Sequence, residues 1–509
     1  MEKLRILFRT KSLSSCDSHG GELKRCLTAL DLTLLGIGCI IGTGIFVLTG
    51  IVSATQTGPA IIVSFVIAGI VCAFAALSYA ELAGSIGGCG SAYGYCYTAF
   101  GELIAWIIGW ALILEYGIAV AAVANGWSGY FQNILATFDI VIPKEYAFGP
   151  HAGGIINLPA FGIVITLMLL LIAGVKHGAR LNNVMVFIKL FTIAIFIAVA
   201  SQHVRVENWI PFNPFGWYGE NELNKPIGIL GGSAMVFFAY IGFDAVSTAA
   251  EETKNPQRDL PIGIICSLLV TTVLYIIVAG LLTGIVPYQT LNVDSPISFA
   301  LSQIGFEFAS ALVATGAIAG ITTVMLVCFF GLTRIIFAMG RDGLFPCCLS
   351  KVNKKTQTPI FAIVIAGSII ALIAGFFPLA ELAELVNIGT LLAFFVVCIG
   401  VIALRIKRPE MTRSFKVPLG WTIPLLGALS VAGLGFFLSE TTWTRFFMWQ
   451  TLGLLIYFSY GLWHSKLRTT NPTPLKLRGT SKRRTVHGRK KIPTSQKLRR
   501  ARKKSQPWK

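Results

Sequence analysis

Residues 36–46 read Gly-Ile-Gly-Cys-Ile-Ile-Gly-Thr-Gly-Ile-Phe, in the middle of the first long apolar segment of the chain. Each glycine weakens a helix by roughly 0.5 to 1 kcal/mol relative to alanine, and lipid tolerates interrupted backbone only where it faces protein or water. We therefore expect a broken transmembrane helix whose second half begins near Thr43 and presents free N–H groups to an anion. Close packing of small residues against another helix is the alternative explanation of this spacing.

The composition of the chain is that of a membrane protein. Of its 509 residues, 54% are hydrophobic and 13% are charged, and the mean hydropathy of +0.72 is too high for a soluble protein. Apolar stretches long enough to cross a bilayer recur about 12 times, which predicts an all-α polytopic membrane protein. Their centres lie near Ile41, Val71, Ile113, Ile165, Ile195, Val236, Val273, Thr322, Val364, Phe394, Leu429 and Leu454.

Sequence motifs for catalysis or metal binding are missing. The 11 cysteines lack metal-ligand spacing, which argues against a zinc site and against a disulfide framework. The 6 histidines are dispersed, and the sequence contains no phosphate-binding loop or nucleophile motif. We expect no enzyme activity, no metal and no cofactor.

The placement of lysine and arginine predicts the topology. Basic residues gather in the N-terminal segment, in alternate loops and in the C-terminal tail, and such residues mark the cytoplasmic side of a membrane. We therefore expect a multi-pass protein of the cell membrane with both termini in the cytoplasm. Its predicted parts are a cytoplasmic segment at 1–28, a transport core at 29–404, a basic cytoplasmic loop at 405–420, two further spans at 421–465 and a basic cytoplasmic tail at 466–509.

The tail at 466–509 holds most of the formal net charge of +19 and has no acidic residue. Such runs attract anionic lipid at about 1 kcal/mol per basic residue and bind nucleic-acid phosphates without sequence preference. We interpret the tail as a disordered, solvated segment that favours a cytoplasmic C-terminus. Binding of the tail to anionic lipid or nucleic acid is the alternative, although we expect no specific nucleic-acid partner.

Two charged side chains fall inside apolar spans. Because a charge at the centre of a bilayer costs about 2.5 to 3.5 kcal/mol, Glu115 must face a cavity or a partner rather than lipid. Lys189 also lies well inside a span. Burial disfavours the charged form of lysine, so this side chain can load and release a proton. The alternative is a permanently charged lysine that donates to the carbonyl groups of a broken helix.

A second discontinuity is expected in the sixth span, where residues 231–244 read Gly-Gly-Ser-Ala-Met-Val-Phe-Phe-Ala-Tyr-Ile-Gly-Phe-Asp. Glycines bracket an aromatic cluster there, and an acidic residue lies deep in the segment. An odd number of spans separates the starts of the first and sixth, so these two cross the bilayer in opposite directions. This arrangement is typical of an inverted repeat of five plus five helices, with the binding site where the two breaks meet.

These motifs together resemble the amino acid/polyamine/organocation superfamily of permeases, specifically its cationic amino acid transporter branch. The resemblance extends over residues 23–416. The motifs that carry it are GIG at 36–38, IGTGIF at 41–46, GPA at 58–60, YAEL at 79–82, GSAY at 90–93, Trp110 with LEY at 114–116, FAYIGFD at 238–244, EE at 251–252 with NP at 255–256, and RDG at 341–343. The resemblance implies the leucine-transporter fold with discontinuous helices 1 and 6, and transport by alternating access.

The resemblance also implies a binding site. The N–H groups of Thr43 and Gly44 would bind the carboxylate of an amino acid, and its amino group would meet the carbonyls of Ile40, Phe238, Ala239 and Ile241. Lys189 matches the family's lysine at the place that sodium takes in sodium-coupled relatives, which favours protons as the coupling ion. Asp244 and Glu115 are placed to meet a cationic side chain.

The expected function is therefore secondary active transport of a small-molecule L-amino acid, cationic or neutral, together with H⁺ across the lipid bilayer. Two departures from the family pattern favour neutral amino acids as much as arginine or lysine. Ala111 stands where the family often has an acidic residue, and the proline usual near Gly87 is missing. An amino acid or polyamine exchanger on the same fold is the alternative.

Overall fold

The computed structural model describes residues 7–11, 27–86, 92–173, 178–222, 225–249, 253–353, 356 and 358–467. Most of the expected N-terminal segment 1–28 and nearly all of the expected tail 466–509 lie outside these ranges. The same holds for residues 87–91 and for the acidic pair at 251–252, which carry part of the motifs above.

The first half of the described chain runs from the first broken helix to the end of α10. Its elements are α3 (Ala29–Ile40), η1 (Gly44–Leu48), α4 (Thr49–Val52), η2 (Ser53–Thr57), η3 (Gly58–Ala60), α5 (Ile61–Ile86), α6 (Ala92–Ala99), α7 (Glu102–Thr137), α8 (Lys144–Ala147), η4 (Pro150–Ala152), α9 (Leu158–Ala173) and α10 (Gly178–Ala200).

The second half begins with a short antiparallel pair of strands, β1 and β2, ahead of the second broken helix. Its elements are η5 (Val206–Trp209), β1 (Gly219–Glu220), β2 (Pro226–Ile227), α11 (Gly228–Val236), η6 (Phe237–Tyr240), α12 (Ala245–Thr248), α13 (Pro256–Ile285), η8 (Tyr288–Leu291), α14 (Pro296–Gln303), α15 (Glu307–Arg341), η9 (Cys347–Ser350), α16 (Ile360–Phe376), α17 (Leu379–Lys407), α18 (Thr422–Gly435), α19 (Glu440–Ile456), η10 (Tyr457–Gly461) and α20 (Leu462–His464).

The all-α polytopic class is confirmed. Seven helices in the described ranges are long and apolar enough to cross a membrane, or eight if the bent pair α18 and α19 counts as one span. The apolar helices α3, α9 and α16 are shorter. Each expected span centre lies within a described helix except Ile41, which lies at the break that follows α3.

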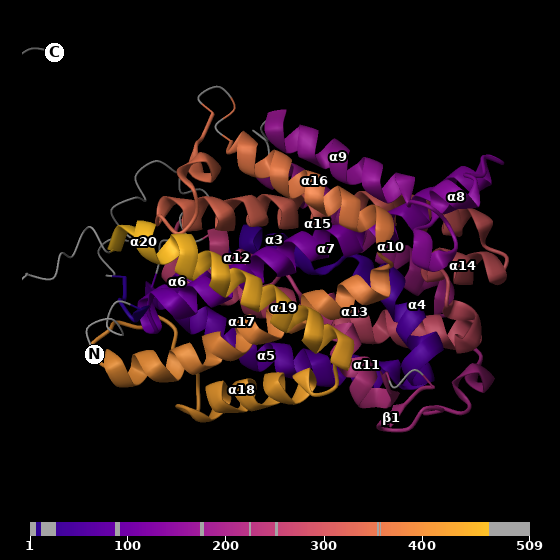
Figure 1. The fold of residues 1–509 in the computed structure, drawn as a ribbon. Helices are drawn as coiled ribbons and strands as arrows, with labels where there is room; N and C mark the ends of the chain where they lie inside the picture. The colour runs from indigo at the N-terminus through magenta and orange to yellow at the C-terminus, as the bar shows by residue number, and fades with distance from the viewer. Residues whose placement is uncertain are drawn as a thin grey trace, which may run out of the picture. The chain divides into compact units, whose positions relative to one another are not determined.

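The packing of the helices comes in matched pairs from the two halves. α7 of the first half packs against α17, and α15, which takes the same place in the second half, packs against α10. Likewise α3 packs against α13, and α11, which takes the place of α3 in the second half, packs against α5. The counterparts α7 and α15 also pack against each other, at the centre of the bundle (Figure 1). This pairing of first-half with second-half helices is the pattern that an inverted repeat of five plus five helices predicts.

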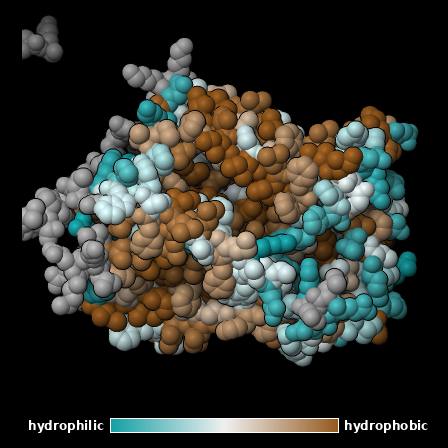
Figure 2. Space-filling model, viewed as in Figure 1, coloured by the Kyte–Doolittle hydropathy of each residue, from teal (hydrophilic) through white to brown (hydrophobic). Residues whose placement is uncertain are grey.

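The surface of the bundle separates apolar from polar regions. Figure 2 shows hydrophobic residues over the middle of one face and hydrophilic residues gathered at the end that carries α8, α14 and β1. Large apolar side chains such as Leu169, Phe191 and Leu429 are exposed on α9, α10 and α18. Exposed apolar side chains on helices of this length fit a lipid-facing surface.

One buried carboxylate ties α5 to the segment after α17. Glu81, 1% exposed, accepts hydrogen bonds from Arg405 Nε at 2.9 Å and from the Arg405 terminal nitrogen. It also accepts one from the Val417 N–H at 2.7 Å and pairs with Arg413 at 3.4 Å. α17 ends at Lys407 and therefore includes Arg405, whereas the sequence predicted that the transport core ends at residue 404. The basic loop is thus held to the bundle by an acid inside α5.

Glu81→Gln is expected to lower the stability of the folded transporter. The change keeps the shape of the side chain but removes the charge that two guanidinium groups share, and hydrogen bonds to charged groups contribute about 1.5 to 3 kcal/mol each. We expect a lower melting temperature in detergent. The same change at Glu410, which is exposed on the same segment, is the control and should leave the melting temperature unchanged. Equal melting temperatures for both variants would contradict a structural role of Glu81.

Candidate functional site

The first helix is broken where the glycine-rich stretch predicts. The capping box of Thr28 and Asp31 starts α3, which ends at Ile40 when Ile41 turns to an extended conformation. The chain resumes as a π-helical turn from Gly44, with Thr43 at the N-cap position but without a capping hydrogen bond from its side chain. As first residues of the half-helix, Thr43 and Gly44 have N–H groups without an intrahelical acceptor. No hydrogen bond among the described residues uses these two groups, and the buried Thr43 hydroxyl has no partner there either.

The sixth span is broken as well. α11 ends at Val236, the η6 turn follows, and Ile241 is extended before α12 begins at Ala245. Gly242 has a φ of +120°, a conformation that is open to glycine and strained for other residues. Two discontinuous helices are therefore present at the predicted positions.

The two breaks lie against each other. A Cβ atom added at Gly44 would be 2.4 Å from Ala239 Cα, so the backbones of the two half-helices are in direct contact. Tyr275 of α13 joins them: its hydroxyl is 2.8 Å from the Ile40 carbonyl and 2.7 Å from the Ala239 carbonyl. A phenol carries one proton, so it satisfies one of these carbonyls at a time. The other carbonyl is left as an acceptor for a ligand.

Tyr275 is a site residue that the sequence reasoning missed. A single tyrosine in an apolar span must find a polar partner for its hydroxyl, and this signal was available. Its partner is not readable from the sequence, because Ile40 lies 235 positions away.

Tyr275→Phe is expected to weaken substrate binding. The phenyl ring keeps its packing against Phe65 and Tyr240, while the carbonyls of Ile40 and Ala239 lose the one donor that they share, at about 1 to 3 kcal/mol for an unsatisfied group. We expect the KM for uptake to rise about tenfold, which corresponds to about 1.4 kcal/mol. Tyr146→Phe, at an exposed side chain, should leave the KM unchanged. An unaltered KM in the first variant would remove Tyr275 from the site.

Lys189 holds the end of the first half-helix. The side chain is fully buried, and its Nζ donates to the Gly38 carbonyl at 2.6 Å and to the Ile41 carbonyl at 3.0 Å. On the other side its stem packs on α15, where a Cβ added at Gly320 would be 2.7 Å from Lys189 Cγ. The amine thus lies at the break, inside the bundle. These contacts are those of the alternative in which the lysine donates to the carbonyl groups of a broken helix.

Two acidic side chains form a second group next to the breaks. Glu115 of α7 and Asp244 are both buried and close enough to interact electrostatically. Asp244 accepts a hydrogen bond from the Tyr116 hydroxyl at 2.9 Å, and one oxygen of each carboxyl group has no hydrogen-bond partner among the described residues. The predicted pair is therefore brought together, near Cys39 at the end of α3.

The remaining predicted residues line the second break. Phe238 and Ala239 are buried in η6, and the Phe238 carbonyl accepts the Ile241 N–H at 3.2 Å. Asn387 of α17 also reaches the second break: its amide donates to the carbonyls of Ala234 and Met235 at 2.9 and 3.3 Å. Asn387 thus ties α17 to the end of α11 just ahead of the break.

An all-helical membrane protein in which two broken helices meet at a buried polar site has the architecture of a secondary transporter. A family model described as amino acid permease matches residues 27–459, and the chain belongs to this family. The expected membership of the amino acid/polyamine/organocation superfamily is confirmed, and the chain is a permease rather than an enzyme.

Several characterised relatives are similar over most of their length. The chain is 48% identical to the methylthioribose transporter of Bacillus subtilis over 465 residues, which is 91% of this chain and 99% of the relative. It is 49% identical to the branched-chain amino acid permease BcaP of the same organism over 469 residues, with the same shares covered. It is 38% identical to the vacuolar cationic amino acid transporter 4 of Arabidopsis thaliana over 392 residues, 76% of this chain and 64% of that protein.

Proposed function

We propose that this permease carries L-amino acids across the cell membrane by alternating access, in symport with protons. The observation that carries the proposal is the contact between the two breaks. The N–H groups of Thr43 and Gly44, which have no partner in the part of the chain that the structure describes, lie there together with the carbonyls of Ile40 and Ala239. Donors on one side and acceptors on the other match the carboxylate and ammonium groups of a zwitterion.

The amino acid backbone is held by main-chain groups of both half-helices. Its carboxylate accepts from the N–H groups of Thr43 and Gly44, with the Thr43 hydroxyl as a further donor, at the positive end of the second half-helix. Its ammonium group donates to the carbonyls of Ile40 and Ala239, with those of Phe238 and Ile241 nearby. Because these contacts involve groups that every amino acid has, they select the class of substrate and not its side chain.

Asp244 and Glu115 set the preference for the side chain. The two buried carboxyl groups have oxygens without hydrogen-bond partners in the described ranges, which supports a cationic side chain such as that of arginine or lysine. A neutral side chain is accommodated if the pair is protonated, since a shared proton relieves the repulsion between two close carboxylates. The relatives named for branched-chain and for cationic amino acids support both classes.

Lys189 couples proton movement to the breaks. In its charged form the amine has three N–H donors, and two of them reach the carbonyls of Gly38 and Ile41. Loss of the proton removes the charge from both hydrogen bonds, which weakens the tie between α10 and the end of α3. The first half-helix is then free to move, as alternating access requires.

The end of the bundle that carries Lys11, Arg405 and Arg413 is placed in the cytoplasm. These basic residues support this orientation by the positive-inside rule, and Lys11 pairs with Asp342 at 2.9 Å on the same end. We propose that the basic tail lies on the cytoplasmic side of the membrane, where contact with anionic lipid is the alternative to a fully solvated segment.

Uptake into proteoliposomes tests the proposed function. An inward proton gradient alone should drive the accumulation of labelled L-leucine or L-arginine, and unlabelled amino acids of the same class should compete. Dissipation of the gradient with a protonophore should stop net uptake. Uptake that requires preloading with an amino acid and ignores the gradient would identify an exchanger instead.

A second candidate substrate is methylthioribose, favoured by the relative that carries this name at 48% identity. This sugar lacks the ammonium and carboxylate groups that the two breaks would bind. Including it in the competition experiment separates the two substrates: inhibition by methylthioribose without inhibition by any amino acid would replace the proposal.

A further inference from the structure

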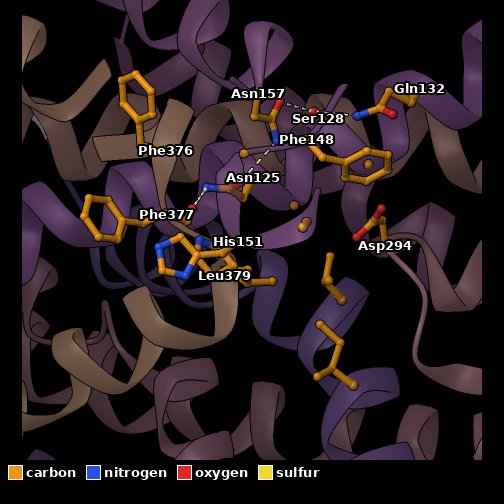
Figure 3. A pocket seen from close by; sticks show the side chains of 17 residues that line it. Asn125, Ser128, Gln132, Phe148, His151, Asn157, Asp294, Phe376, Phe377 and Leu379 are labelled. Carbon is orange, nitrogen blue, oxygen red and sulfur yellow. Dashed lines mark hydrogen bonds between the residues drawn. The ribbon is translucent and has the colours of Figure 1, made fainter. Parts of the chain in front are cut away.

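A cavity of about 90 Å³ lies apart from the two breaks, between α7, the loop before α9 and the residues ahead of α14. At roughly 10 to 15 Å³ per water, it has room for several waters or a small polar group. Figure 3 shows its lining. Asn125, Ser128 and Gln132 come from one face of α7, Asn157 from the start of α9, and Asp294 from the opposite wall. We call it the Asp294 cavity.

The amide side chains of the α7 wall use their N–H donors within the protein. Gln132 donates to Ser128 Oγ at 2.9 Å and to the Ala147 carbonyl at 3.2 Å. Ser128 donates to Asn157 at 2.7 Å, and Asn157 donates to Asn125 Oδ1 at 3.1 Å (Figure 3). Asn125 in turn donates to the Phe377 carbonyl at 3.1 Å. The oxygens of Asn125, Ser128 and Asn157 also accept within the protein, and Asn157 Oδ1 takes a second hydrogen bond from the Ala160 N–H at 3.1 Å. Gln132 Oε1 is the amide oxygen of this wall that accepts no hydrogen bond in the described ranges, and it is left as an acceptor for a ligand.

Asp294 adds a negative charge to this acceptor. Asp294 is exposed where it lines the cavity, and its side chain makes no hydrogen bond or ion pair with another residue of the described ranges. Partial desolvation by the surrounding protein raises its pKa above the ordinary value of an aspartate. A carboxylate without a partner gains from a nearby cation. The ring of Phe148, which also lines the cavity (Figure 3), adds a surface that attracts cations.

The lining offers little to an anion. Of the residues around the cavity, His151 alone can carry a positive charge, and its Nδ1 lies 3.5 Å from Glu381 Oε1. A donor-rich group such as an ammonium or a guanidinium therefore fits this cavity better than a carboxylate or a phosphate does.

The cavity adjoins the first broken helix. Val47 and Ile51, which follow the break, are part of its lining. Gly126 of α7 also lines it, and a Cβ added there would be 2.2 Å from Thr43 Cγ2. Gly126 therefore lies between the cavity and Thr43 of the first break, which it contacts.

We propose that the Asp294 cavity is a second binding site, which takes ammonium and guanidinium groups through the Asp294 carboxylate. The further claim that its ligand is the transported amino acid rests on the proposed function. In that case Asp294 would hold the α-ammonium group of the amino acid before the contact between Thr43 and Gly126 opens. Binding of an amine at the cavity does not depend on that step.

n-Butylammonium chloride tests the site, because this probe has an ammonium group and no carboxylate for Thr43 and Gly44. The full-length protein in nanodiscs is titrated with it by calorimetry, against potassium chloride of equal ionic strength. Asp294→Asn should weaken binding by at least about tenfold, as expected for the loss of a charge-assisted hydrogen bond. Asp294→Glu should keep it within a few-fold. If Asp294→Asn is not recovered folded, Asp294→Ser replaces it.

Asp139→Asn is the matched control. Asp139 is exposed just beyond α7, outside the cavity lining, and has a φ of +58° that asparagine tolerates. This variant should bind n-butylammonium as the unaltered protein does. Equal affinities in Asp294→Asn and Asp139→Asn would overturn the proposal, as would equal heats with potassium chloride.

Uptake separates this inference from the proposed function. Asp294→Asn should raise the KM for L-leucine or L-arginine several-fold with kcat kept, because a loading site affects capture and not the later steps. A fall in kcat at constant KM would overturn the loading role. If the unaltered protein takes up neither amino acid, the proposed function fails, while the n-butylammonium titration still decides whether the cavity is an amine site.

Discussion

Lys189→Met is expected to abolish proton-driven accumulation of substrate, with a loss of at least about a hundredfold in the initial rate. Methionine keeps much of the volume of the lysine stem against Gly320 but has no donor for the carbonyls of Gly38 and Ile41. Two buried acceptors without partners cost about 1 to 3 kcal/mol each, and 1.4 kcal/mol is a factor of ten. The measurement is uptake of labelled amino acid into proteoliposomes under an inward proton gradient.

The remaining activity of this variant distinguishes the two roles of the lysine. If Lys189 carries the proton, exchange of preloaded amino acid should persist at a reduced rate and without pH dependence. If the amine only holds the broken helix, substrate binding and exchange should be lost together with uptake. Lys351→Met, at an exposed lysine outside the site, should behave as the unaltered protein. Gradient-driven uptake that survives in Lys189→Met would refute both roles.

Gly44→Ala is expected to reduce kcat/KM for uptake by about ten- to a hundredfold. The added methyl group would be 2.4 Å from Ala239 Cα and 2.5 Å from Ala239 Cβ, and these atoms belong to the second break and cannot rotate away. Overpacking of this kind costs about 1 to 3 kcal/mol. The two breaks are pushed apart, so donors and acceptors no longer match one zwitterion. Steady-state uptake and equilibrium binding of labelled amino acid measure the effect.

Gly162→Ala is the matched control for this change. Gly162 lies within α9, and a Cβ added there would meet no atom within 4 Å. Alanine is favoured over glycine inside a helix by about 0.8 to 1 kcal/mol, so the melting temperature should stay equal or rise while uptake is unchanged. Similar losses of uptake in both variants would show that the effect of Gly44→Ala is not specific to the contact between the breaks.

The class of the protein and the positions of its two breaks could be predicted from the sequence. Hydropathy depends on composition along the chain, and spans of the required length follow from it directly. The glycines around Thr43 and Gly242 weaken helices locally, so the interruption after Ile40 and that after Val236 were predictable as well. The depth of Lys189 in a span likewise indicated a buried amine at a polar site.

The partners of these groups were decided by the tertiary structure. Tyr275 reaches Ile40 across 235 positions of the chain, and Lys189 reaches Gly38 across 151. Asn387 reaches Ala234 across 153 positions, and nothing near it in the sequence indicates that it donates to α11. The Asp294 cavity likewise depends on five separate segments. Local composition determines where a helix ends or fails, whereas the group that satisfies a freed carbonyl or amide is set by packing between distant segments, which no local pattern encodes.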